Sequence, residues 1–176
     1  AALISTPWRE NGTVYNAALL IDKGEIIGKT FKHHLPNYGV FDEKRIFTAG
    51  KLPTPLEFKG QKLGVMICED MWFDDVAMHL KSQGADILIV PNGSPYYQDK
   101  FSVRTELAQK RVNETALPLI YVNQVGGQDE LVFDGGSFTM NKDGKITQQL
   151  PFFEEYTTMH PDENQNLQEI RSQIKS

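Results

Sequence analysis

The sharpest candidate for covalent chemistry in this sequence is a thiol. Cys68 closes the apolar segment 62–68 and is followed directly by Glu69 and Asp70. A thiol with an ordinary pKa of about 8.5 is a poor nucleophile at neutral pH until a neighbouring cation or base shifts it towards thiolate. A lone cysteine on an apolar strand is also typical of an inert core residue. The residues around Cys68 therefore leave a catalytic and a structural role open.

The segments that must position Cys68 alternate between the hydrophobic patterns of strands and of helices. Segments of strand type at 62–68, 86–91 and 117–124 are separated by two helical segments. One helix begins at Asp74 or Asp75 and ends at Gly84, and the other covers 101–115. This β-α-β-α-β series predicts an α/β layered domain with ligand chemistry where strand ends meet loops.

Hairpins and loops flank this series. Segments 16–21 and 25–32 predict a β-hairpin, and a second hairpin is expected around Asp143-Gly144, a pair that suits a type I′ turn. The stretch between these hairpin strands and the 62–68 strand is punctuated by proline and glycine, which implies long loops of the kind that often carry function. The polar tail 161–176 predicts either a docked helix or the start of a linker.

Composition excludes several classes of function. The 176 residues are 40% apolar, which predicts one compact domain, and the net charge of −5 is opposite to what a nucleic-acid-binding surface needs. No apolar run approaches the roughly 20 residues of a membrane span, and the N-terminus lacks the pattern of a signal peptide. The single cysteine fits a reducing compartment, so we expect a soluble, cytoplasmic protein with no membrane or nucleic-acid partner.

Three longer strings carry a family resemblance. They are KHHLPNYGVFDEKRIF at 32–47, CEDMW at 68–72 and VNQVGGQDELVFDGGS at 122–137. In this order they resemble the lysine and cysteine motifs of the nitrilase superfamily, in the form found in the glutaminase domain of glutamine-dependent NAD synthetases. The resemblance implies a nitrilase-like α-β-β-α sandwich, incomplete at its N-terminus, with a partial carbon-nitrogen hydrolase domain at 1–158 and a tail or linker at 159–176.

The resemblance also implies a catalytic set. Cys68 would be the nucleophile that forms a thioester with glutamine, and Lys32 would be its cationic partner. A nearby ammonium lowers a thiol pKa and can donate a hydrogen bond to the oxyanion of the tetrahedral intermediate. Glu43 matches the supporting glutamate of the family; its alternative is a surface salt bridge with Lys44 or Arg45.

Substrate contacts follow from the same resemblance. Tyr38 and Glu69 would hold the α-amino end of glutamine, and Ser94 and Arg104 would bind its α-carboxylate. The alternatives are a turn role for Ser94 and a helix-surface charge for Arg104.

We expect this chain to lack a counterpart of the family's general-base glutamate. That glutamate lies on an early strand well before the lysine motif, whereas the carboxylates here that precede Lys32 are Glu10, Asp22 and Glu25, in an expected loop and hairpin turn. We assign the base to none of them. A fragment without the base should be slower by about 10²- to 10⁴-fold, and its uncovered sheet edge and apolar patch should favour association.

The expected partners are glutamine, a separate synthetase domain of the same polypeptide, and further copies of the chain. No cofactor is expected for the glutaminase step. ATP and Mg²⁺ are expected only in the synthetase domain, which would use the released ammonia to make NAD from deamido-NAD.

Two other readings remain. Four histidines (His33, His34, His79 and His160) permit a Cys-His amidohydrolase, although neighbours such as His33 and His34 should point to opposite faces of an extended chain, so at most one could reach Cys68. No histidine pair has i, i+4 spacing and a single cysteine cannot anchor a structural zinc, so no metal site is expected. The second reading is a non-catalytic assembly or docking fragment of the same fold.

Overall fold

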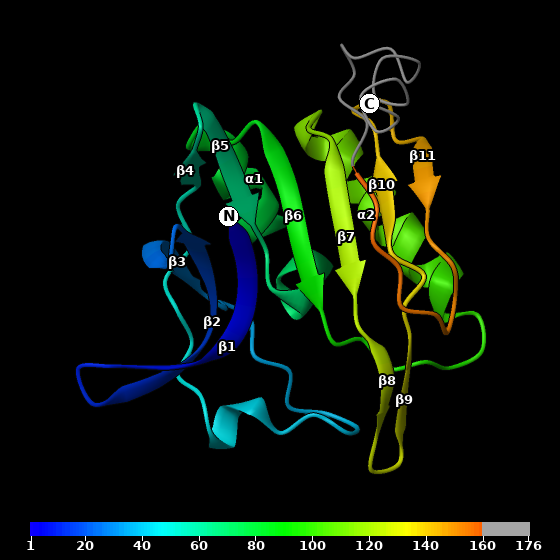
Figure 1. The fold of residues 1–176 in the computed structure, drawn as a ribbon, viewed down its shortest axis with the longest axis horizontal. Coiled ribbons are helices and arrows are strands. Elements are labelled where there is room, and N and C mark those ends of the chain that lie inside the picture. Colours follow the sequence, from blue (N-terminus) through cyan, green and yellow to red (C-terminus); the bar gives the residue numbers. More distant parts are fainter. Residues whose placement is uncertain (160–176) are drawn as a thin grey trace.

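The computed structural model describes residues 1–159, and a six-stranded sheet is its central layer (Figure 1). Three neighbouring strands are parallel, namely β5 (Gln61–Val65), β6 (Ile87–Asn92) and β7 (Leu119–Asn123). Antiparallel strands complete both edges, with β4 (Leu56–Phe58) on one side and β10 (Phe138–Met140) and β11 (Ile146–Gln149) on the other. The predicted β-α-β-α-β series and α/β class are confirmed.

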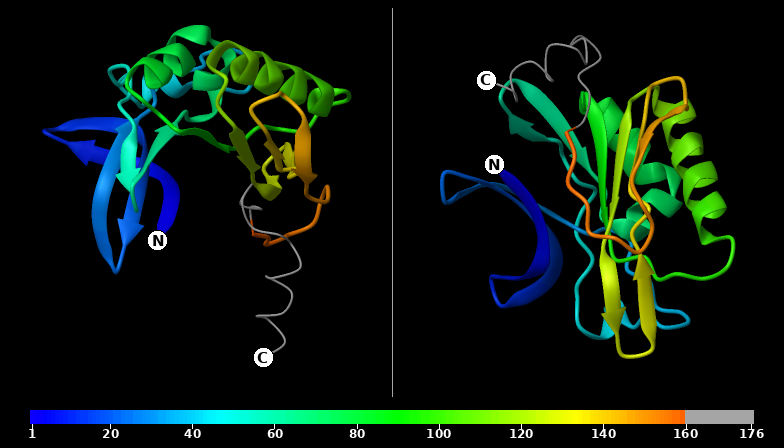
Figure 2. Two further views of the ribbon diagram at one scale, coloured as in Figure 1. Left: turned by 90° about the horizontal axis from the view of Figure 1, so that it is seen from above. Right: turned by 45° about the vertical axis from the view of Figure 1, so that its right-hand side comes forward.

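Two helices cover one face of this sheet (Figure 2). They are α1 (Asp74–Ser82) and α2 (Lys100–Thr115). Alternate strand residues such as Leu88, Val90 and Leu119 point to the helices and are fully buried in the main core. The period-two alternation of the strands therefore selects which side chains form this core.

A three-stranded antiparallel sheet lies against the opposite face. It consists of β1 (Ala2–Glu10), β2 (Thr13–Asp22) and β3 (Glu25–Phe31). Ala18 and Leu20 of β2 form a second core cluster with residues that include Leu63 and Val65 of β5, whereas Met66 belongs to the helix side. Residues 1–159 thus build three layers, helices and two sheets, of a nitrilase-like sandwich.

The first hairpin is confirmed, but the strand that precedes it was not predicted. Lys23 and Gly24 have φ angles of 50° and 84°, as a type I′ turn between β2 and β3 requires. Residues 2–10 pair with β2 along their whole length. Pro7 obscured this strand, although proline is tolerated on an edge strand. The expectation that Glu10 lies in a loop is therefore wrong, because it ends β1.

Two further hairpins follow β7. The glycine-rich segment after β7 forms a hairpin of β8 (Val125–Gln128) and β9 (Leu131–Asp134). The β10–β11 hairpin is confirmed, but Gly144 has a positive φ of 75° and Asp143 does not, so its turn is not type I′. The Asn141 side-chain oxygen instead accepts the backbone N–H groups of Asp143 and Lys145 and holds a wider loop.

The bounds near Cys68 shift by a few residues. Strand β5 ends at Val65, so Cys68 does not close it but begins the short 3₁₀ helix η2 (Cys68–Trp72). Phe73 occupies the N-cap position of α1 and leaves Asp74 in the first turn, while Gly84, with φ of 83°, follows the helix end as expected. A second 3₁₀ helix, η1, spans Glu43–Arg45. Among the described residues no helix is long and apolar enough to cross a membrane, and the predicted tail at 161–176 lies outside them.

Candidate active site

Cys68 occupies a sharp turn beyond the carboxyl end of β5. Its φ angle is +50°, a left-handed conformation that is uncommon for residues other than glycine and that must be held by its surroundings. The Asp70 carboxylate accepts the Ile67 N–H at 2.9 Å, and the Asp70 N–H donates to the Ile67 carbonyl at 3.2 Å. These two bonds close the turn around Cys68, whose side chain remains half-buried.

Lys32 follows the end of β3 and is 1% exposed. Its backbone is paired on both sides, since its N–H donates to the Asn16 carbonyl and its carbonyl accepts the Gly50 N–H, both at 2.8 Å. The Lys32 Nζ donates to Glu43 Oε1 at 2.6 Å, and Asn16 Nδ2 donates to Glu43 Oε2 at 3.3 Å. The alternative for Glu43, a surface salt bridge with Lys44 or Arg45, is wrong, because Arg45 pairs with Asp42 and Glu43 turns inward to Lys32.

Asp70 connects the lysine and cysteine segments. Its Oδ1 accepts the backbone N–H groups of His33 at 3.0 Å and His34 at 2.8 Å, while its Oδ2 accepts the Ile67 N–H. The carboxyl group is buried, and this burial raises the pKa of Asp70 even though the N–H donors and the Lys32 charge act in the opposite direction. One side chain thus holds the backbone on both sides of the site. Sequence reasoning missed this role of Asp70, and that of Asn16.

Burial and the surrounding charges shift the pKa of the Cys68 thiol. Burial raises the pKa of Cys68; the Lys32 charge lowers it, and Glu69, Glu43 and Asp70 raise it further. Lys32 therefore acts in the predicted direction, but burial and three carboxylates outweigh it. The expectation that Lys32 holds the sulfur as thiolate stays a prediction.

Tyr38 and Glu69 lie together beside the nucleophile turn. The Tyr38 hydroxyl donates to both carboxylate oxygens of Glu69, at 2.8 and 2.9 Å. Burial of the hydroxyl, followed by the Glu69 interaction, raises the pKa of Tyr38 and keeps it a hydrogen-bond donor. Both residues line a cavity of about 710 Å³ that Lys44 and Phe47 also border. Tyr38 separates it from a second cavity of about 460 Å³ whose lining includes Trp72.

Ser94 and Arg104 form a separate network. The Arg104 guanidinium, 1% exposed, makes two bonds to the Asp134 carboxylate, at 2.8 and 2.9 Å, and three to Ser94 Oγ and the Ser94 and Pro95 carbonyls. Asn123 donates to Asp134 and to the Ser94 carbonyl. The alternative of Arg104 as a helix-surface charge is wrong, and its carboxylate partner is Asp134 of the chain itself. A substrate contact from Ser94 or Arg104 stays a prediction.

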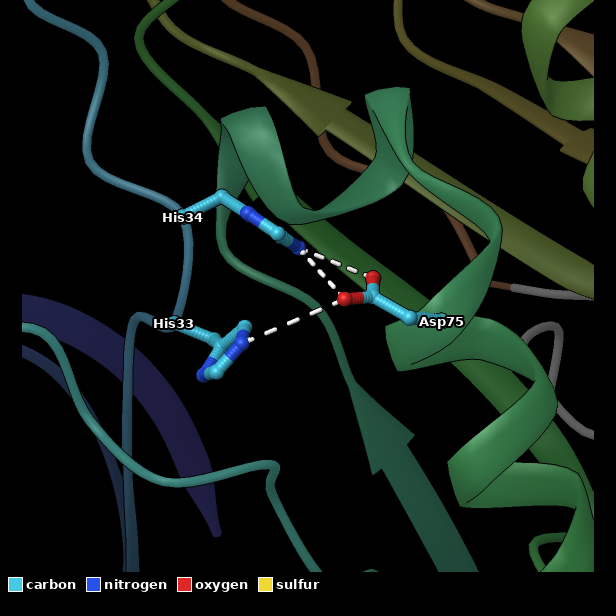
Figure 3. Close-up of side chains that lie close together, drawn as sticks. All are labelled: His33, His34 and Asp75. Carbon is cyan, nitrogen blue, oxygen red and sulfur yellow. Dashed lines mark hydrogen bonds and ion pairs between the residues drawn. The ribbon is translucent and has the colours of Figure 1, made fainter.

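The two adjacent histidines do not diverge as expected. Their rings meet edge to face with centroids 4.6 Å apart, and both point to Asp75 in α1 (Figure 3). The reason is a bend at His33. The Asp70 carboxylate accepts hydrogen bonds from two successive backbone N–H groups there, and the chain is no longer extended. Among the interactions of Cys68 within residues 1–159, the cation that acts on the thiol is Lys32 rather than a histidine.

Comparison with known proteins agrees with this arrangement. The model of the family "Carbon-nitrogen hydrolase" matches residues 1–171. The glutamine-dependent NAD(+) synthetase of Rhodobacter capsulatus is 47% identical over 152 residues, which are 86% of this chain and 28% of that protein. The chain therefore spans less than a third of that relative.

Solved structures share the fold. The glutamine-dependent NAD+ synthetase from Acinetobacter baumannii, in complex with ADP, has a TM-score of 0.83 at 41% identity and covers 88% of this chain and 30% of its own. A mutant amidase from Nesterenkonia sp. AN1, with the acetamide moiety of fluoroacetamide added covalently at its active-site cysteine, has a TM-score of 0.71 at 29% identity, with 85% and 56% covered. The family match, the layered fold and the site together show that this chain belongs to the carbon-nitrogen hydrolase family.

Proposed function

We propose that this chain hydrolyses the side-chain amide of glutamine through a thioester on Cys68. The observation that carries the proposal is the Asp70 carboxylate, which joins the segment after Lys32 to the turn of Cys68. The buried Lys32 ammonium, held by Glu43, and the half-buried thiol therefore belong to one site. Support also comes from the relative named a glutamine-dependent NAD(+) synthetase and from the amidase that is modified at its cysteine.

The nucleophile is the thiolate form of Cys68. The sulfur loses its proton and attacks the amide carbon, and the Lys32 ammonium stabilises both the thiolate and the oxyanion of the tetrahedral intermediate. The amide nitrogen takes up a proton and leaves as ammonia, so that the carbon–nitrogen bond breaks and a thioester remains. Water then cleaves the thioester to glutamate and restores the thiol. Glu43, bonded to Lys32 Nζ and to Asn16, holds the ammonium in place.

Tyr38 and Glu69 are the proposed contacts for the α-amino group of glutamine. The Glu69 carboxylate lines the cavity of about 710 Å³ and is oriented by the Tyr38 hydroxyl, so it can accept from an ammonium group there. Ser94 and Arg104 are the proposed contacts for the α-carboxylate. This second assignment requires the Arg104–Asp134 pair to open, because the five hydrogen bonds of the guanidinium are made within the chain.

In the longer protein, the ammonia would feed an ATP-dependent NAD synthetase domain. The hydrolytic step as proposed needs no cofactor, and ATP and Mg²⁺ would serve that second domain. Association of the chain with further copies of itself also stays a prediction.

A glutamine-like diazoketone tests the hydrolytic proposal. The chain should gain one adduct by intact-mass spectrometry, and the Cys68→Ala variant should gain none. A wild-type chain that remains unlabelled after prolonged incubation would contradict the proposal and favour a non-catalytic docking module.

The same reagent separates Lys32 from a histidine as the partner of Cys68. We expect Lys32→Ala to slow labelling more than His34→Ala does. A Cys-His amidohydrolase predicts the opposite order, because its sulfur would depend on an imidazole.

A further inference from the structure

Three side chains outside the proposed catalytic set converge on one point. His33 and His34 come from the segment after Lys32, and Asp75 comes from the first turn of α1 (Figure 3). One ligand atom from each residue lies within 4.8 Å of the others. His34 Nε2 is 2.8 Å from Asp75 Oδ1, and His33 Nε2 is 4.0 Å from Asp75 Oδ2.

The proton on His33 can be placed by its partner. Its Nδ1 lies 2.7 Å from the Gly50 carbonyl oxygen, which can only accept, so Nδ1 carries the hydrogen. In the neutral ring, Nε2 then presents a lone pair towards the Asp75 carboxylate. Two electron-rich atoms that face each other attract a cation between them. A backbone carbonyl that accepts from the far nitrogen is also the usual support of a metal-binding histidine.

The other parts of the cluster are held independently of any metal. The His34 ring stacks on Phe73 with centroids 4.0 Å apart. The backbone N–H groups of both histidines are bound by Asp70. The Asp75 carboxylate accepts the Val76 N–H at 2.7 Å, at the start of α1. Each ligand therefore has its own anchor, which reduces the reorganisation that binding would require.

We propose that His33, His34 and Asp75 bind a divalent transition-metal ion of the Zn²⁺ type. Two imidazole nitrogens and one carboxylate suit Zn²⁺ and its neighbours in the first transition row, whereas Mg²⁺ and Ca²⁺ prefer oxygen ligands. In tetrahedral coordination at about 2.0–2.1 Å, ligand atoms lie roughly 3.3 Å apart, between the spacings seen here. The three side chains are 22–43% exposed, so a fourth position is open to solvent.

This inference reverses a premise of the sequence analysis. No metal site was expected, partly because adjacent histidines point apart on an extended strand. Asp70 bends the chain and removes that obstacle. A bound ion would join the segment next to Lys32 to helix α1, so it should also stabilise the fold.

Competition with a chromophoric chelator measures the proposed site directly. The wild-type chain should bind one equivalent of Zn²⁺, while His34→Gln and Asp75→Asn should each weaken binding by about tenfold or more, as loss of a metal-site contact does. His79→Gln is the matched control, because His79 lies on the same helix outside the cluster, and it should leave the affinity unchanged. Equal Zn²⁺ binding by all four proteins, or none by the wild type, would overturn the proposal.

Thermal melting guards against a variant that simply fails to fold. Zn²⁺ should raise the Tm of the wild type and of His79→Gln, because a ligand that binds the folded state stabilises it. It should raise the Tm of His33→Gln less. If the cluster variants melt like the wild type without metal and gain the same Tm with it, the ion binds elsewhere. None of these readouts depends on amide hydrolysis, so the site can fail or stand apart from the proposed function.

Discussion

Two ion pairs in this molecule each contain a fully buried cation, but the cations differ in how many of their hydrogen-bond donors are used. Arg104 and Asp134, 1% and 2% exposed, satisfy each other and the neighbouring Ser94. Lys32 is equally buried, yet within residues 1–159 its ammonium makes one hydrogen bond, to Glu43, out of three that it can donate. A cation whose donors are all used holds a structure together, whereas one with donors left over beside a thiol can stabilise a developing negative charge.

The largest expected effect is a loss of fold stability when the Arg104–Asp134 pair is broken. Arg104→Met leaves the Asp134 carboxylate buried without its partner, which should lower the free energy of unfolding by about 3–5 kcal/mol. The control is Arg45→Met, which removes an exposed pair with Asp42 and should cost about 0–1 kcal/mol. Urea unfolding of both variants checks this. If both variants lose equally little stability, the buried Arg104–Asp134 pair does not stabilise the fold.

A substitution in the Lys32–Glu43 pair should have its main effect on the reactivity of Cys68. Lys32→Met removes the charge beside Cys68 and should slow diazoketone labelling by about 10²- to 10³-fold, the usual cost of losing one oxyanion donor. Lys29→Met is the matched control, since Lys29 lies on β3, just before Lys32 in the chain, and pairs with Glu10 at the surface. Labelling rates measured by mass spectrometry should be unchanged in the control. A loss of less than about threefold in Lys32→Met would remove the distinction between the two pairs.

Asp70 should stabilise the fold because its carboxylate joins the segment after Lys32 to the turn at Cys68. In Asp70→Asn an amide group faces at least one backbone N–H that the carboxylate now accepts, and an unpaired buried donor costs about 1–3 kcal/mol. Asp74→Asn, an exposed change nearby, should stay within about 0.5 kcal/mol of the wild type. Thermal unfolding of both variants measures this. An Asp70→Asn chain as stable as Asp74→Asn would mean that the two segments are held by other contacts.

The motif strings predicted much of the site, and the reason is local. Lys32, Glu43 and Cys68 belong to short strings whose residue order carries their roles. Asp70 and Asp134 also lie within these strings, but nothing in a string shows that they bind groups 30 to 37 residues away. Asn16, which binds Glu43 from 27 residues away, lies in none of them. Their partners are known only once the strands are in place. Likewise, the strand at 2–10 could not be predicted locally, because it is defined by its pairing with β2 in the folded chain.

The effect of burial on the Cys68 thiol could not be predicted from the sequence either. Opposite charges near a thiol are visible in the sequence, whereas the desolvation of that thiol depends on the packing around it. Burial and the carboxylates of Glu69, Glu43 and Asp70 together exceed the effect of Lys32. The pKa of the thiol is therefore raised by packing that the motifs alone do not show.

The smallest expected effect is a shift in the pH dependence of Cys68 alkylation. The pKa of Cys68 is raised, so iodoacetamide should react slowly at neutral pH and about tenfold faster per pH unit until a midpoint above the usual value of about 8.5. Lys32→Met removes the group that lowers this pKa and should move the midpoint to higher pH. Glu69→Gln removes a negative charge that raises it and should move the midpoint to lower pH, by about one unit or less. A wild-type midpoint below about 8.5 would mean that the Lys32 ammonium outweighs burial, and that the thiolate is already formed before the substrate arrives.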